Sequence, residues 1–129
     1  MSKVLDLVLM HKYYDMIESG KKREEYREIT PYWFIRLLNY DPEEYIDGKP
    51  IPTYFESNGF DSIADGIRWD LEISGVLHFK DFTHVRFHRG YTSTTMTFEI
   101  KGMSIGQGRE ELGAEKDKKY FVIKLGTKL

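Results

Sequence analysis

Lys22, Glu25 and Arg27 are the residues whose types and spacing best suit a binding site in this 129-residue sequence. They lie in GKKREEYREITPYW, residues 20–33, a run of mixed charge that turns abruptly aromatic. In a β-strand, Glu25 and Arg27 would share one face, and Lys22 would approach from the preceding turn. A carboxylate between two cations holds the guanidinium flat, ready for a phosphate or the edge of a base. The competing interpretation is a salt-bridged strand without a ligand, which contributes little stability at an exposed surface.

Aromatic side chains close to this run could stack on a base. Tyr32 lies off the apolar stripe of the helix that follows, so it is the better candidate to line a cleft. Tyr26 lies within the strand itself, where cross-strand packing is the simpler explanation. Trp33 belongs to the apolar stripe and is expected in the core.

A second basic stretch is FTHVRFHRGY, residues 82–91. His84, Arg86 and His88 alternate on one face of the expected strand and would extend a basic surface towards Tyr91. A solvated sheet face without a ligand is the simpler interpretation. The two histidines would be about 13 Å apart in a strand, which is too far for one zinc ion. We therefore expect no metal site here.

Hydrophobic periodicity predicts the elements that position these residues. Apolar runs or alternating apolar residues predict strands over residues 4–9, 22–28, 82–91, 93–106 and 119–126. An apolar stripe from Met10 to Ile17 predicts a helix, which Gly20 ends as a left-handed cap. Thr30 and Pro31 are typical of a helix start, as N-cap and first helical position. The buried face of this second helix is expected to comprise Trp33, Phe34, Leu37 and Leu38, with Arg36 on the solvent side.

This order of elements predicts an α+β fold, in which helices flank a small, mostly antiparallel β-barrel. The chain is short enough to form one domain over residues 1–129. Residues 41–80 are predicted to form an insertion, a loop with one helix marked by Ile63, Ile67 and Leu71. Residues 107–118 are expected to be a polar connection with up to one helical turn. The residues predicted to lie inside the barrel are Leu5, Leu7, Leu9, Val85, Phe87, Phe98, Ile100, Phe121 and Ile123.

Composition limits the classes of function. The net charge is −2, so any site for a polyanion must be a local patch. The absence of cysteine excludes a disulfide framework, a thiolate zinc site and a cysteine nucleophile. The apolar run over residues 4–10 is too short to span a membrane, and it lacks the features of a signal peptide. We expect a cytoplasmic protein without membrane contact.

Gly20, Lys22, Glu25 and Arg27 form the spacing G-x-K-x-x-E-x-R directly after a predicted helix. This spacing resembles the signature of the ASCH domain family, a branch of the PUA-like β-barrel superfamily. The resemblance is to members with an EYRE-containing second strand. It extends over TPYW (30–33), Arg36-Leu37, VRFHRGY (85–91), Gly106, Gly108, LGA (112–114) and YFVIKLG (120–126). The insertion has no counterpart in the minimal family domain, and Leu112 stands where tryptophan is expected.

The resemblance implies a five- or six-stranded barrel with a cleft between the barrel and the first two helices. It implies a module that binds RNA, a nucleotide or a nucleoside. We expect no metal or other cofactor, and the ligand contacts that we expect for this function are Lys22, Glu25, Arg27, Tyr32, Arg86 and Tyr91.

Two other functions stay open. The resemblance also extends to hydrolases of the amidohydrolase or ribonuclease type, in which Lys22 and Glu25 would be catalytic. The amidohydrolases carry threonine in place of Glu25, and Glu99 is our candidate for their later catalytic glutamate. Because neighbouring acids and bases nearly balance, we expect Lys22 to remain a cation and the protein not to hydrolyse N4-acylated cytidines efficiently. The third possibility is a regulatory module that contacts a partner protein through the insertion.

Overall fold

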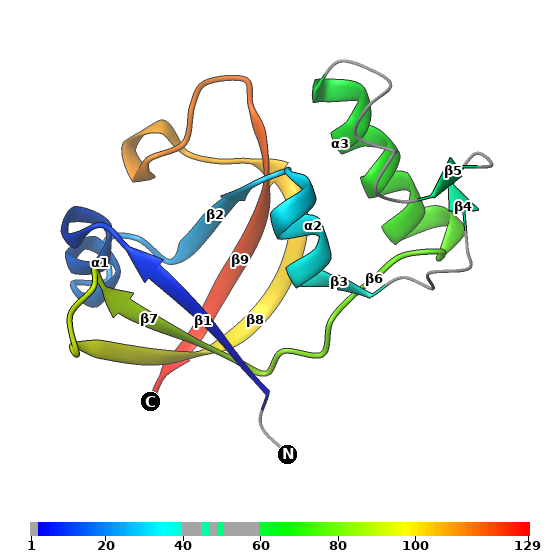
Figure 1. Ribbon diagram of the computed structural model, residues 1–129. Coiled ribbons are helices and arrows are strands. Elements are labelled where there is room, and N and C mark those ends of the chain that lie inside the picture. The colour runs from blue at the N-terminus through cyan, green and yellow to red at the C-terminus, as the bar shows by residue number, and fades with distance from the viewer. Residues whose placement is uncertain (1–2, 40–44, 47–48, 51–59) are drawn as a thin grey trace.

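A five-stranded sheet, curled into half a barrel, is the main feature of the computed structural model (Figure 1). The structure describes residues 3–39, 45–46, 49–50 and 60–129. The sheet has the order β1-β7-β8-β9-β2, and its neighbours are antiparallel except β1 and β7, which are parallel. Its strands are β1 (Val4–Leu9), β2 (Glu24–Glu28), β7 (His84–Arg89), β8 (Thr95–Gln107) and β9 (Lys119–Lys128). The predicted α+β class with a mostly antiparallel, barrel-like sheet is confirmed.

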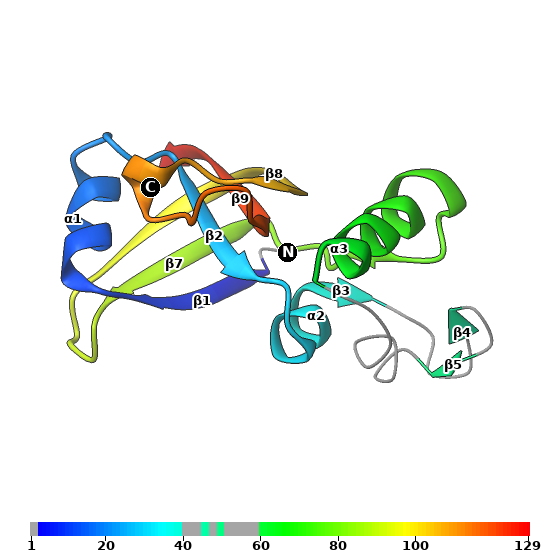
Figure 2. The same cartoon turned by 90° about the horizontal axis from the view of Figure 1, so that it is seen from above.

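Helices lie at opposite ends of this half-barrel (Figures 1 and 2). Helix α1 (His11–Glu18) lies at one end, whereas α2 (Pro31–Leu37) and α3 (Phe60–Trp69) lie at the other. A π-helical turn, η2 (Asp70–Ser74), continues α3, and a 3-10 turn, η3 (Glu110–Leu112), interrupts the connection between β8 and β9. Two short strand pairs complete the described part: β3 (Leu38–Asn39) with β6 (His78–Phe79), and β4 (Tyr45–Ile46) with β5 (Lys49–Pro50).

The helix boundaries follow from local chemistry, as the sequence predicts. Thr30 is the N-cap of α2, and its hydroxyl oxygen accepts a hydrogen bond from the backbone N–H of Trp33 at 3.3 Å. Pro31 occupies the first helical turn, where the N–H that it lacks would have no partner in the helix. Gly20 follows α1 with a φ of +83°, a left-handed conformation that glycine adopts without steric cost. These signals place β2 directly between two helices.

The predicted core is confirmed with one exception. The eight other residues expected inside are buried, whereas Ile100 is half-buried and packs at the margin of the core. The pairing of β8 with β9 shifts register between Phe98 and Gly102. A register shift disturbs the alternation of inward and outward side chains, which explains the position of Ile100.

The described part of the insertion contains the predicted helix. Ile63 and Ile67 of α3 are buried against the main core, and Leu71 of η2 is half-buried. The antiparallel pair of β3 and β6 brings the two ends of the insertion together. Among the described residues, no helix has both the length and the apolar composition needed to cross a membrane.

Candidate functional site

Lys22, Glu25 and Arg27 converge, as the alternation of the strand predicts. The Nζ of Lys22 lies 3.0 Å from Oε1 of Glu25, and Nη2 of Arg27 lies 2.9 Å from Oε2. Lys22 is only 3% exposed and Glu25 only 4%, and among the described residues they are the polar or charged ones that the fold buries. The Oε1 atom of Glu25 also accepts from the backbone N–H of Tyr26 at 2.9 Å. Both carboxylate oxygens of Glu25 are therefore engaged within the protein.

Arg27 connects the two edges of the curled sheet. Strands β1 and β2 are the edge strands, and Nη2 of Arg27 donates to the carbonyl oxygen of Val8 in β1 at 3.1 Å. The guanidinium also lies over the Trp33 ring, 4.8 Å from its centroid. Its Nε is buried and has no hydrogen-bond partner among the described residues. A side chain thus bridges the opening that the sheet order leaves between β1 and β2.

The ammonium of Lys22 lies against two aromatic rings. Its Nζ is 4.5 Å from the ring centroid of Tyr13 in α1 and 5.2 Å from that of Tyr26 in β2. Aromatic faces attract cations, so both rings help to hold the ammonium in place. Lys22 and Tyr26 were candidates from the sequence. Tyr13 lies within the predicted apolar stripe of residues 10–17, and nothing in the sequence indicated that its ring faces Lys22.

Two hydrogen bonds at the hydroxyl of Tyr26 fix the position of its ring. The hydroxyl donates to the carboxylate of Glu24 and accepts from the backbone N–H of Arg109 at 3.1 Å. Burial raises the pKa of Tyr26 strongly, and the hydrogen bond to Glu24 adds to this rise. The ring also packs against Tyr120 at a centroid distance of 5.7 Å. The Tyr26 side chain is therefore uncharged and held in a fixed position, in agreement with its predicted packing role.

A pocket of about 280 Å³ opens beside this cluster. It is lined by the end of β1, by α1, β2 and β9, and by the connection that contains Gly113 and Glu115. The cluster of Lys22, Glu25 and Arg27 carries a formal charge of +1, whereas Glu28 and Glu115 add negative charge to the lining. Ligand sites for drug-sized molecules usually start near 300 Å³, so this pocket suits one base or nucleoside-sized group.

Lys118 pairs with two acidic residues of the pocket lining. Its Nζ lies 2.9 Å from Oε1 of Glu28 and 3.8 Å from Oε2 of Glu115. The hydrogen bond to Glu28 raises the pKa of Lys118. Lys118 thereby offsets part of the negative charge that Glu28 and Glu115 give the lining.

Tyr32 does not line this pocket. It is 59% exposed on α2, and its hydroxyl accepts a hydrogen bond from Nη1 of Arg36 at 3.2 Å. Its ring meets Trp33 edge-on at 4.9 Å, and Arg27 lies over the Trp33 ring, so these three side chains form a chain of contacts from the surface to the pocket wall. Arg36 is half-buried over both rings rather than on the solvent side of the helix, which corrects the expectation for that residue.

Arg86 and Tyr91 lie elsewhere on the half-barrel. The parallel register of β1 and β7 places Asp6 opposite Arg86, and Nε of Arg86 lies 2.6 Å from Oδ1 of Asp6. His88 contacts the same carboxylate at 2.8 Å. Tyr91 is 99% exposed in the turn after β7. The carboxylate of Asp6 therefore offsets the positive charge predicted for this strand face. Arg86 and Tyr91 do not lie beside Lys22 in the pocket.

The Asp6 cluster gives stability that depends on pH. The hydrogen bond from Arg86 holds the pKa of Asp6 below its ordinary value, against a smaller opposing effect of burial. A lowered pKa contributes stability that is complete above the unfolded pKa of about 3.9 and is lost as the pH falls through the folded pKa. We expect Asp6→Asn to lower the free energy of unfolding by about 0.5 kcal/mol at neutral pH, since the pair is largely solvated. In urea titrations the difference from the unchanged protein should shrink below about pH 4; a difference that stays constant with pH would contradict this assignment.

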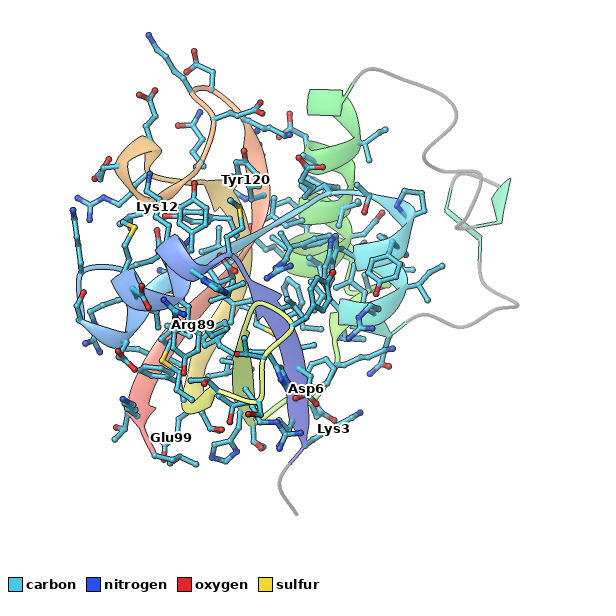
Figure 3. The ribbon with its side chains drawn as sticks, turned by 60° about the vertical axis from the view of Figure 1, so that its left-hand side comes forward. Lys3, Asp6, Lys12, Arg89, Glu99 and Tyr120 are labelled. Atoms are coloured by element: carbon cyan, nitrogen blue, oxygen red, sulfur yellow. The ribbon has the colours of Figure 1, made fainter. Side chains whose placement is uncertain are left out.

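Glu99 is remote from the pocket. Figure 3 shows Glu99 near the lower end of the molecule, well below Tyr120, which lines the pocket. Glu99 pairs across the strands with His84, far from the lining residues. Among the described residues, no cluster of three histidine or carboxylate side chains could hold a metal ion.

Comparison with known proteins found no match to this chain. No protein-family model matches this chain. Neither the curated proteins nor the solved structures compared with it include a match.

Proposed function

We propose that this protein binds a nucleotide unit, free or within single-stranded RNA, in the pocket between β1 and β2. The observation that carries the proposal is the burial of Lys22 and Glu25, together with Arg27, in the wall of that pocket. Burying charged groups is costly, and such groups seldom improve stability over apolar ones of the same size. Their concentration at one pocket is better explained by a ligand than by stability.

The chemistry of the wall suits a planar group with negative charge or acceptor atoms. Lys22 and Arg27 supply hydrogen-bond donors to this wall. Tyr13 and Tyr26 supply aromatic surface. The volume of about 280 Å³ fits one base better than several consecutive ones.

Binding is favoured over hydrolysis because Glu25, the carboxylate that is paired with Lys22, is already engaged at both oxygens. Both oxygens of Glu25 accept hydrogen bonds from the protein, and Glu99 lies away from the pocket. The ion pair and the two aromatic faces suit Lys22 to clamp an anion. We further propose that the chain is a divergent member of the ASCH domain family. Support for this comes from the convergence of Lys22, Glu25 and Arg27 of the G-x-K-x-x-E-x-R spacing at one pocket in a half-barrel.

Titration of the purified protein with nucleoside monophosphates and with a short, fluorescently labelled single-stranded RNA tests the proposal. Affinity should fall as salt rises, because phosphate contacts release counterions. Lys22→Met should weaken binding by about tenfold or more, since a charge-assisted hydrogen bond contributes roughly 1.5–3 kcal/mol. The combination of Lys22→Met with Arg27→Gln should also flatten the dependence on salt.

The matched controls are neighbours of the same type that lie outside the pocket. Lys21→Met and Arg23→Gln remove exposed cations from the same run and should leave the affinity nearly unchanged. Equal binding by the unchanged protein and the Lys22/Arg27 double variant at low salt would overturn the proposal. Deacetylation of N4-acetylcytidine that disappears in Lys22→Met would instead make the protein an enzyme.

A further inference from the structure

Strand β8 extends well beyond its neighbour β7. The two strands pair only over residues 95–99 of β8, after which the backbone N–H of Ile100 donates to the carbonyl of Thr83 at 3.0 Å. From Gly102 to Gln107, β8 pairs with β9 on one side. On its other side no described residue forms a strand pair with this stretch. Within the part of the chain that the structure describes, residues 101–106 therefore present a free strand edge.

The register shows which backbone groups this edge presents. The N–H of Leu125 donates to the carbonyl of Arg23, so the odd-numbered residues of β9 are hydrogen-bonded towards β2. The even-numbered residues of β9 then bond towards β8, where their partners are Gly102, Ser104 and Gly106. The N–H and C=O groups of Met103 and Ile105 consequently point towards the free edge.

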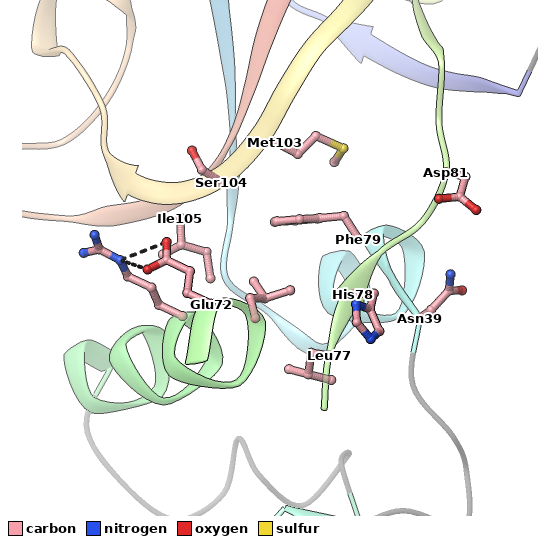
Figure 4. Close-up of a pocket in the computed structure, with 11 residues that line it drawn as sticks. Asn39, Glu72, Leu77, His78, Phe79, Asp81, Met103, Ser104 and Ile105 are labelled. Carbon is pink, nitrogen blue, oxygen red and sulfur yellow. Dashed lines mark hydrogen bonds and ion pairs between the residues drawn. The ribbon is translucent and has the colours of Figure 1, made fainter. Parts of the chain in front are cut away.

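A large trough lies directly along this edge (Figure 4). It has a volume of about 570 Å³ and runs between β8, β6 and the helical layer of α3 and η2. Its apolar surface comes from Leu71, Leu77, Phe79, Met103 and Ile105. A second hollow of about 300 Å³ adjoins it towards Ile100 and shares Phe79, Asp81 and Met103. The edge thus faces a depression with apolar surface, and no described residue pairs with its outward backbone groups.

We propose that an extended peptide segment of a partner protein adds to this edge as a further strand. Met103 and Ile105 would exchange backbone hydrogen bonds with the segment, and alternate side chains of the segment would enter the trough. This interface is separate from the pocket between β1 and β2 and does not depend on the function proposed for that pocket.

The edge and its surroundings favour a single extended chain. No described residue pairs with the outward backbone groups of Met103 and Ile105, and a strand edge offers such groups to one further strand. The hollow beside this edge is bounded on its other sides by β6, α3 and η2. The rim carries opposite charges, with Arg68 paired to Glu72 at 3.4 Å and with Asp81 and His78 nearby. The partner segment is therefore expected to be uncharged, with apolar residues at alternate positions.

A pool of capped hexapeptides tests the proposal. They alternate threonine with valine, isoleucine, leucine or phenylalanine, and they are added to the full chain labelled with ¹⁵N. Backbone amide signals should shift around Met103 and Ile105, and hydrogen exchange at these two amides should slow by about tenfold or more. Alternate residues of the bound peptide direct their N–H groups towards β8 and away from it. N-methylation of the residues that face β8 should abolish binding, whereas N-methylation of the other residues should not.

Two variants of Met103 provide a test and its matched control. Met103→Pro removes the outward N–H while retaining the bonds that Gly102 and Ser104 make to β9, and proline is tolerated where the N–H of a strand faces outwards. It should abolish peptide binding, whereas Met103→Leu should retain it. Should Met103→Pro fail to fold, the N-methylated peptides decide the question alone.

Four outcomes would overturn the proposal. Absence of any change at Met103 and Ile105 with the whole pool would exclude strand addition, as would binding that is insensitive to N-methylation. Protection of both amides without peptide, at every protein concentration, would mean that the chain itself covers the edge. Protection without peptide that vanishes on dilution would assign the edge to a second copy of this chain.

Discussion

Replacement of Glu25 by leucine is expected to lower the free energy of unfolding by about 3–5 kcal/mol. Glu25 is the buried counter-ion of Lys22, at 3.0 Å, and its removal leaves an ammonium that is only 3% exposed without a carboxylate. The two aromatic rings near Lys22 cannot replace a carboxylate, because cation–π contacts contribute only about 0.5–2 kcal/mol. Urea denaturation at neutral pH measures the loss.

A double variant separates the loss of the charge pair from the loss of packing. Lys22→Met with Glu25→Leu should recover part of the stability, because an apolar pair of similar volume often replaces a buried ion pair without cost, whereas Arg27 still lacks its carboxylate partner. Glu72→Leu is the exposed control, since its pair with Arg68 is solvated, and it should change stability by less than about 1 kcal/mol. If the double variant were as unstable as the sum of the single ones, the destabilisation would not arise from the unpaired charge.

Gly108→Ala is expected to lower the free energy of unfolding by about 1–3 kcal/mol. An added Cβ would overlap the Cβ of Ala114 and would lie 3.0 Å from ring atoms of Tyr26. Neither neighbour yields easily, because a Cβ is fixed by its backbone and Tyr26 is anchored at its hydroxyl by Glu24 and Arg109. A shift of the Tyr26 ring would also disturb its contact with Lys22, so ligand affinity should fall together with stability.

Gly106→Ala is the matched control for this change. Gly106 lies two residues earlier, at the end of β8, and an added Cβ would meet nothing within 4 Å. Its stability should stay within about 0.5 kcal/mol of the unchanged protein. Thermal or urea unfolding of both variants, followed by ligand titration, checks the prediction, and equal losses at the two glycines would show that the close approach at Gly108 is not the cause.

Some of the candidate site was predictable, because Glu25 and Arg27 are two residues apart in a strand. The period of two places such residues on one face whatever the strand packs against. Thr30-Pro31 and Gly20 delimit this strand through local backbone chemistry, and both signals lie within a few residues of their effect. Eight of the nine expected core residues are buried for the same reason, since the alternation of apolar residues directly reports the inner face.

The sequence by itself determined the local elements, the apolar faces and the pairing of Glu25 with its two cations. Only the tertiary structure decided which distant residues meet them. The parallel pairing of β1 with β7 brings Asp6 to Arg86, and the curl of the sheet brings the carbonyl of Val8 to Arg27. Likewise, the pairing of β7 with β8 stops at Glu99, so no described strand pairs with the second half of β8 on that side. The physical reason is that periodicity reports one face of one element, whereas strand order and register depend on how all the faces are buried together.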